Sequence, residues 1–244
     1  MPSGAASGPS GAASGPSGAA SGHGDVAAVR PGGAAASGAG GEDELGSEDR
    51  SRVRLVVVRH GATEWSQSGR HTGRTDLPLL DEGRRQAREL GSRLADHDFA
   101  LVLTSPLRRA RQTCALAGFG PVARECDDLR EWDYGDYEGR TTDEIRAKRP
   151  GWSLWRDAVP GGETARQVGD RADRVIEAVR VQDGDVLAFA HAHVLRVVAA
   201  RWVGLPATDG ALLTLSPATI SVLGWERDVA VVERWNDAAG DALG

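Results

Sequence analysis

The chain has 244 residues and a net charge of −6, and 40% of its residues are hydrophobic. Its first 50 residues contain 13 of the 32 glycines, no aromatic residue, and three copies of the unit PSGAASG at 2–8, 9–15 and 16–22. A segment with so little to bury cannot offset the entropy of ordering its chain. We therefore expect a disordered tail over 1–50 and one folded domain over 51–244, which is too large to need disulfide staples.

Charge and composition exclude several classes of protein. The first 50 residues carry six acids and two arginines, which leaves the domain nearly neutral, so nucleic acid is not an expected partner. No apolar run approaches the roughly 20 residues of a membrane span, and the N-terminus does not look like a secretory signal. The two cysteines, Cys114 and Cys126, match no disulfide framework or zinc motif. We expect a cytoplasmic protein without a membrane partner; whether it forms a homo-oligomer is left open.

Strand and helix patterns alternate from residue 51 onward. The β-branched run 53–58 predicts a strand that is buried on both faces. Residues 81–97 have the apolar spacing of an amphipathic helix, and 99–103 predict a second strand. Ser105 followed by Pro106 is typical of a helix start, with serine as the cap and proline in the first position.

The second half of the domain continues this alternation and then changes to strands alone. We expect a long helix over 163–180, a strand over 186–190 and a helix over 194–203. Three short strands are then predicted at 211–215, 220–225 and 229–235. The pattern predicts a three-layer α/β/α fold with a mainly parallel central sheet, whose last strands are antiparallel or at an edge.

Polar residues follow the predicted strands, where open α/β sheets bind their ligands. Three strand ends and one loop contribute two arginines, two histidines and one acid: Arg59, His60, Arg109, His191 and Glu131. Arginines bind phosphate oxygens, while a histidine and a carboxyl group can serve as nucleophile and proton donor. The set therefore favours a phosphate site at this edge of the sheet.

Other phosphate chemistries lack their motifs in this chain. There is no GxxxxGK[ST] loop, and neither cysteine has an arginine at the CxxxxxR spacing. His191 and His193 could share one face of a strand and hold a metal ion, but no second cluster of Asp or His accompanies them. We expect no metal and no other cofactor, and keep a metal hydrolase as an alternative.

The ordered motifs resemble the histidine phosphatase superfamily, also called phosphoglycerate mutase-like. Residues 57–65 (VVRHGATEW) resemble its RHG signature, and 71–79 (HTGRTDLPL) resemble the segment that follows. Residues 105–113 (SPLRRARQT), 129–139 (LREWDYGDYEG) and 189–193 (FAHAH) resemble its arginine, acid and second-histidine segments. The similarity is greatest to the bacterial acid phosphatase and fungal sedoheptulose-bisphosphatase branches.

The resemblance implies a metal-independent phosphatase that acts on a small phosphorylated metabolite such as a sugar phosphate. In such an enzyme His60 would become a phosphohistidine and Glu131 would protonate the leaving alcohol. Arg59, Arg109 and His191 would donate to the phosphoryl oxygens. Substrate contacts are expected from Thr63, Ser66, His71, Thr72, Gly73, Tyr134 and Arg156.

Two further hypotheses stay open at this point. A phosphoglycerate mutase is disfavoured because the stretch between Glu131 and His191 is short. A non-catalytic phosphate-binding module is disfavoured because the set of five site residues is intact.

Overall fold

The structure is a computed structural model, and it describes residues 52–238. The expected tail over 1–50 lies outside these residues and stays a prediction. Within the described part of the chain, no helix combines the length and the apolar character that a membrane crossing requires.

A six-stranded sheet with the order β3-β2-β4-β1-β5-β6 forms the middle layer. The four strands β3, β2, β4 and β1 are parallel to one another, whereas β5 and β6 are antiparallel and extend the other side of the sheet. The predicted fold class is therefore confirmed, including the antiparallel end. The strand bounds are β1 Leu55–Arg59, β2 Leu101–Thr104, β3 Arg124–Glu125, β4 Val186–Ala190, β5 Ile220–Glu226 and β6 Val229–Asp237.

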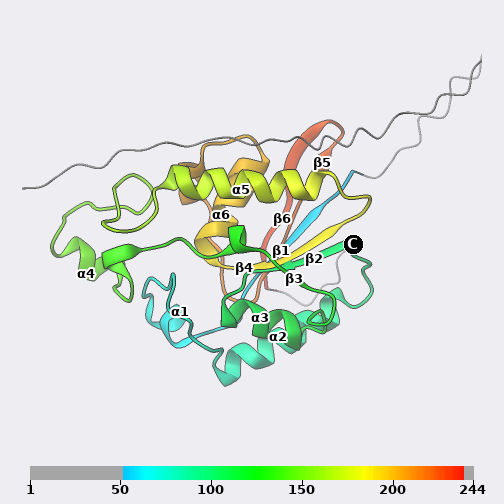
Figure 1. Cartoon of the computed structure of the whole chain (residues 1–244), viewed down its shortest axis with the longest axis horizontal. Coiled ribbons are helices and arrows are strands. Elements are labelled where there is room, and N and C mark those ends of the chain that lie inside the picture. Colours follow the sequence, from blue (N-terminus) through cyan, green and yellow to red (C-terminus); the bar gives the residue numbers. More distant parts are fainter. Residues whose placement is uncertain (1–51, 239–244) are drawn as a thin grey trace, which may run out of the picture. The chain divides into compact units, whose positions relative to one another are not determined.

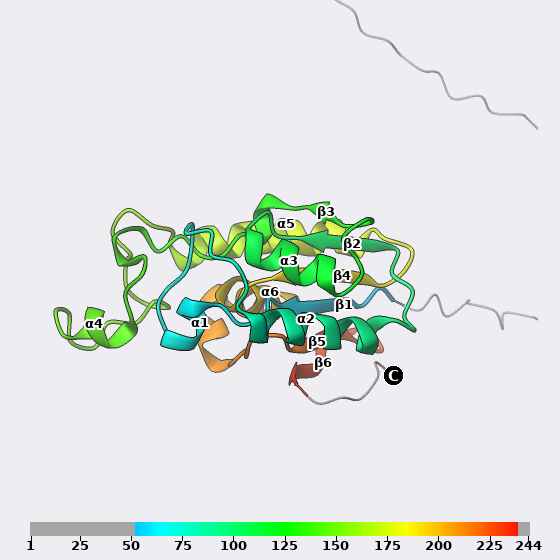
Figure 2. The same ribbon diagram turned by 90° about the horizontal axis from the view of Figure 1, so that it is seen from below.

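Helices cover both faces of this sheet, as Figures 1 and 2 show. On one face lie α5 (Ala165–Arg180) and α6 (Ala192–Trp202), which contact each other; on the other lie α2 (Asp81–Leu94) and α3 (Arg108–Leu116). Two short helices, α1 (Glu64–Ser68) and α4 (Thr142–Arg146), occupy connections at one end of the sheet (Figure 1).

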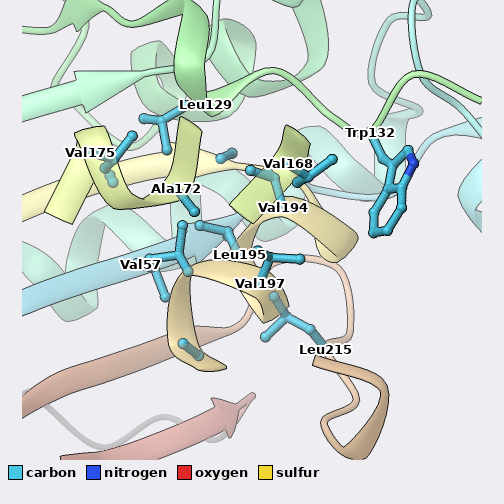
Figure 3. Packing of buried hydrophobic residues seen from close by; sticks show 14 of the residues in the cluster. Val57, Leu129, Trp132, Val168, Ala172, Val175, Val194, Leu195, Val197 and Leu215 are labelled. Carbon is cyan, nitrogen blue, oxygen red and sulfur yellow. The ribbon is translucent and has the colours of Figure 1, made fainter. Parts of the chain in front are cut away.

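Alternate residues of β1 belong to two separate hydrophobic cores. Leu55 and Val57 pack with residues of α5 and α6, and Val56 and Val58 pack with residues of α2 and α3. Figure 3 shows Val57 beside the inner faces of α5 and α6. Burying one such side chain stabilises the fold by about 1.5–3 kcal/mol. Because both faces are apolar, β1 has no polar position until it ends at Arg59.

One predicted strand is wrong. Residues 211–215 belong in part to a 3₁₀ helix, Ala207–Leu212, and then to an extended segment outside the sheet. Their carbonyl groups accept from side chains: the oxygen of Ala211 accepts from the Arg196 guanidinium, and that of Thr214 accepts from the Trp235 indole nitrogen. Side-chain donors therefore replace the strand partner that the sequence pattern implied. The three tryptophans nearby, Trp202, Trp225 and Trp235, all pack against the larger core.

Two helix starts also differ from expectation. Helix α3 begins at Arg108 rather than at Pro106, and no side chain caps it. The Ser105 hydroxyl accepts from the backbone nitrogen of Leu107 at 3.3 Å and also lies 2.8 Å from a ring nitrogen of His191. Helix α6 begins at Ala192, so His191 is its N-terminal cap residue and His193 lies in its first turn. His191 and His193 therefore do not share one face of a strand.

A close backbone contact fixes α2 against the turn that follows β1. A Cβ atom at Gly83 would lie 2.2 Å from the carbonyl oxygen of Ala62, and the backbone nitrogen of Leu80 donates to that same oxygen. We expect Gly83→Ala to lower the free energy of unfolding by about 1–3 kcal/mol, as overpacking typically does. Denaturant unfolding measures this, with Ser92→Ala on the exposed side of the same helix as the control. Equal stability of the two variants would contradict the prediction.

Candidate active site

His60 lies directly beyond the end of β1, beside the end of β4. Its backbone nitrogen donates to the carbonyl of Ala190, and its side chain is buried. The Nδ1 atom lies 2.8 Å from the carbonyl oxygen of Gly61. A carbonyl only accepts, so Nδ1 carries the proton and Nε2 keeps a free lone pair. Burial and the charges of Arg109 and Arg59 hold the pKa of His60 well below its ordinary value, so the neutral, nucleophilic form is the resting form.

Arg59 is a partly buried cation without an acidic partner in the described part of the chain. It donates to the carbonyl oxygen of Leu215, and its buried Nε has no hydrogen-bond partner among residues 52–238. Burial lowers its pKa to about 10, which still leaves it charged at neutral pH. A buried cation with an unused donor is suited to bind an anion.

Arg109 and His191 are fully buried and contact each other. The Nε of Arg109 donates to Nδ1 of His191 at 3.0 Å, and the other nitrogens of Arg109 donate to the carbonyls of Thr72, Gly73 and Thr75. The Nδ1 of His191 therefore carries no proton. Its neutral ring has Nε2–H, which donates to the Ser105 hydroxyl at 2.8 Å. Both ring nitrogens of His191 are thus occupied, and neither it nor Arg109 lines the neighbouring cavity.

Glu131 lies at the N-terminus of α6 and is almost completely buried. Its Oε1 accepts from the backbone nitrogens of Trp132 and Val194, both at 2.9 Å, and its Oε2 accepts from that of His193 at 3.0 Å. Helix N-termini favour carboxylates through their free N–H groups and their dipole. Each carboxylate oxygen has two lone pairs, so Oε2 keeps one acceptor position for a proton or a substrate group.

An ion pair between Arg171 and Glu163 supports the loop that carries Glu131. The Arg171 guanidinium binds both oxygens of Glu163 at 2.9 Å and donates to the carbonyls of Asp128 and Arg130. The Glu163 carboxylate also accepts from the backbone nitrogen of Asp133. These bonds hold the backbone on both sides of Glu131, so its position does not depend on the loop alone.

A cavity of about 340 Å³ brings together most of the predicted site residues. Its walls include His60, Arg59 and Glu131, and also four of the predicted substrate contacts: Ser66, His71, Thr72 and Tyr134. The hydroxyl of Ser66 already donates to the carbonyl of Thr63 in the cap of α1. His71 is buried against Tyr134, with ring centroids 4.7 Å apart.

Three predicted substrate contacts do not line this cavity. Thr63 is fully buried and caps α1, where its hydroxyl accepts from the backbone of Ser66. Gly73 is buried, and its nitrogen donates to the Glu138 carboxylate. Arg156 is exposed on the surface, where it donates to the carbonyl of Gly151.

The structure instead adds Arg196, which the sequence analysis did not single out. It lines the cavity, its guanidinium carbon lies 4.5 Å from the centre of the Trp155 ring, and its Nε donates to the carbonyl of Gly210. Burial lowers its pKa. The spacing from His193 to Arg196 is three residues, which places both on one side of α6. This spacing indicates a shared side only once α6 is known to begin at Ala192.

The residues present do not form an obvious metal site. Within residues 52–238, no three His, Cys, Asp or Glu side chains gather closely enough to hold a metal ion. The lone pair of His191 Nδ1, which a metal would need, accepts from Arg109. The alternative of a metal site on His191 and His193 therefore does not fit this geometry.

These features define a phosphatase site of a known class. The family model for the histidine phosphatase superfamily (branch 1) matches residues 55–238, and the chain belongs to this superfamily. The relatives of this chain that share 34–42% identity with it are named phosphatases, relatives at 26% identity are named probable phosphoglycerate mutases, and this protein is a phosphomonoesterase.

Three relatives illustrate the similarity. An acid phosphatase of Mycobacterium tuberculosis is 42% identical over 180 residues, 72% of this chain and 88% of the relative. A sedoheptulose 1,7-bisphosphatase of Saccharomyces cerevisiae is 40% identical over 188 residues, 62% and 68% of the two chains. The solved structure of a mycobacterial glucosyl-3-phosphoglycerate phosphatase with VO3 has a TM-score of 0.68 and 31% identity, and covers 77% of this chain and all of its own.

The buried histidines make folding depend on pH. Burial lowers the pKa of His71 to about 4, whereas an unfolded histidine titrates near 6.5. Between these values the unfolded chain binds more protons, so the free energy of unfolding falls as the pH drops through this window. We expect His71 alone to contribute about 2 kcal/mol of this loss between pH 8 and pH 5. Denaturant unfolding at several pH values should show a shallower dependence in His71→Gln; an unchanged slope would contradict the assignment.

Proposed function

We propose that this protein hydrolyses small phosphomonoesters of the sugar phosphate class through a phosphohistidine intermediate on His60, without a metal ion. The observation that carries the proposal is the meeting of three groups at one cavity: the free Nε2 of His60, the carboxylate of Glu131, and Arg59, which has no acidic partner among residues 52–238. The printed names of two relatives, a sugar bisphosphatase and a glucosyl-3-phosphoglycerate phosphatase, support the substrate class.

The first step is an in-line attack on phosphorus. The Nε2 lone pair of His60 forms the P–N bond as the P–O bond to the leaving group breaks. Glu131, protonated at Oε2, gives its proton to the leaving oxygen, so the alcohol departs neutral. In the second step the Glu131 carboxylate takes a proton from water as the water oxygen attacks phosphorus, and the P–N bond breaks to release phosphate and neutral His60.

Positive charge takes the place of a metal in this scheme. The transferring phosphoryl group carries its charge on three equatorial oxygens, and positioned cations stabilise it. Arg59 lines the cavity, and Arg109 lies behind His191, whose ring centroid is 5.2 Å from that of His60.

The free thiols of Cys114 and Cys126 suit a reducing compartment, so we infer a cytoplasmic setting.

The intermediate can be trapped directly. Brief incubation with ³²P-labelled substrate and acid-free denaturation should give a phosphoprotein that is labile to acid and stable to alkali. His60→Ala should give no phosphoprotein and no hydrolysis of p-nitrophenyl phosphate, and excess EDTA should leave wild-type turnover unchanged. A labelled His60→Ala protein, or loss of wild-type activity in EDTA, would overturn the mechanism.

Two substrates whose leaving groups differ in their need for a proton test Glu131 as the general acid. In Glu131→Gln we expect kcat/KM for an alkyl phosphate to fall by about 10²–10⁴, because general acid catalysis is lost. The value for p-nitrophenyl phosphate should fall much less, since p-nitrophenolate leaves without protonation. Its turnover should show a burst followed by a slow phase, because the phosphohistidine loses its base.

The control for this experiment is Glu125→Gln, an exposed carboxylate that pairs with Arg111. Thermal unfolding of both variants shows whether the bonds that Glu131 accepts at α6 have been kept. Equal losses on both substrates, with no burst, would assign Glu131 a structural role only.

A further inference from the structure

Tyr134 and His193 form a hydrogen-bonded pair in the wall of the cavity that contains His60. The Tyr134 hydroxyl lies 2.6 Å from Nδ1 of His193, and both residues line the cavity. Tyr134 is 1% exposed and comes from the loop after Glu131, whereas His193 comes from the first turn of α6. The pair therefore joins the loop that carries Glu131 to the first turn of α6, whose backbone nitrogens donate to Glu131.

The direction of this hydrogen bond follows from what each partner can do. Burial raises the pKa of Tyr134 well above its ordinary value, so the hydroxyl keeps its proton. A buried hydroxyl needs an acceptor, and within residues 52–238 its one hydrogen-bond partner is Nδ1 of His193. Tyr134 thus donates and Nδ1 accepts. Burial together with Arg196, His71 and Arg59 lowers the pKa of His193, so its ring is neutral and carries its single proton on Nε2.

The Nε2–H group of His193 has no hydrogen-bond partner among the described residues. The side chain is 19% exposed, so this group is open to the cavity rather than sealed in the core. Its ring is held by aromatic neighbours: the centroid of Trp155 is 5.4 Å away and that of His71 is 6.0 Å away. This Nε2–H group is therefore a neutral donor that is fixed in direction and has no acceptor among residues 52–238.

The position of this donor relates it to the leaving group. The backbone nitrogen of His193 binds Oε2 of Glu131 at 3.0 Å, and its Nδ1 lies 3.9 Å from that same oxygen. In the proposed function this oxygen delivers the proton to the leaving alcohol. In that scheme the His193 ring would lie beside the leaving group, near the carbon atom that bears the ester oxygen.

We propose that His193 determines specificity for polyol leaving groups: its Nε2–H donates to a hydroxyl oxygen close to the ester oxygen, and Tyr134 is the positioning residue that holds the ring in this tautomer. The inference rests on the proposed function and deepens it. A leaving group without that hydroxyl would leave the donor unpaired in a mostly desolvated wall, which is costly. A leaving group that has this hydroxyl accepts the hydrogen bond from Nε2–H, and neither partner needs to be charged.

The test uses two substrates that differ only in hydroxyl groups, glycerol 3-phosphate and propyl phosphate. The measured quantity is the ratio of their kcat/KM values. In the wild type the ratio should favour glycerol 3-phosphate, and in His193→Phe, which keeps a planar ring but has no donor, it should fall by about 10- to 100-fold. His193→Gln, whose amide can donate, should recover part of the ratio. An unchanged ratio in His193→Phe, or a wild-type preference for propyl phosphate, would overturn the inference.

The tautomer of the His193 ring, observed by NMR, tests the role of Tyr134. In ¹⁵N NMR spectra the wild-type His193 should show a protonated Nε2 and an unprotonated Nδ1, and Tyr134→Phe should mix the two forms and lower the substrate ratio several-fold. Tyr137→Phe is the matched control, because its hydroxyl bonds to Arg149 and it does not line the cavity. A protonated Nδ1 in the wild type, or equal effects of the two tyrosine variants, would refute the pairing.

Failure of this inference is distinguishable from failure of the proposed function. The phosphoprotein trap is run on wild type and on His193→Phe with p-nitrophenyl phosphate alongside. Labelled protein with an unchanged substrate ratio refutes the role of His193 only. Absence of label in the wild type refutes the phosphohistidine on which the inference rests, and with it the inference.

Discussion

The buried guanidinium of Arg109 is the interaction on which the site depends. It has no acidic partner in an ion pair within residues 52–238, and its donors bind the His191 ring and three carbonyls of the loop after α1. This one side chain joins the start of α3, the end of β4 and the loop that carries Thr72. A buried cation is costly unless its donors are satisfied. The three carbonyls and the His191 ring satisfy the donors of Arg109 without neutralising its charge.

Backbone groups also hold Glu131 in place. Glu131 is bound by backbone nitrogens at the start of α6, so the helix that begins after His191 also positions the carboxylate. His193 belongs to this helix turn and reaches Tyr134 in the acid loop. His60, Glu131 and the polar wall of the cavity are therefore coupled through two parallel strand ends and one helix N-terminus, and a shift of α6 would disturb all of them together.

Sequence reasoning succeeded where one physical rule dominated. The fully apolar runs of β1 and β4 could only be buried strands, and groups at their carboxyl ends meet because parallel strands end at the same edge. It failed where a side chain competes with the local rule. Ser105 looks like a helix cap but its hydroxyl also bonds to His191, and residues 211–215 look like a strand but the carbonyl of Ala211 accepts from Arg196. Both competing partners are distant in sequence, so no local pattern contains them.

The amino-acid sequence alone determined the fold class, the family resemblance and the identity of the five polar groups that follow the strands or lie in the loop of Glu131. Only the tertiary structure decided what each group does with its hydrogen bonds. Arg109 and His191 turn toward each other, while Arg59, Glu131 and Arg196 line the cavity and Arg156 lies on the surface. The physical reason is that strand and helix periodicity is written in neighbouring residues, whereas the partner of a buried polar atom is chosen by the packing of segments far apart in the chain.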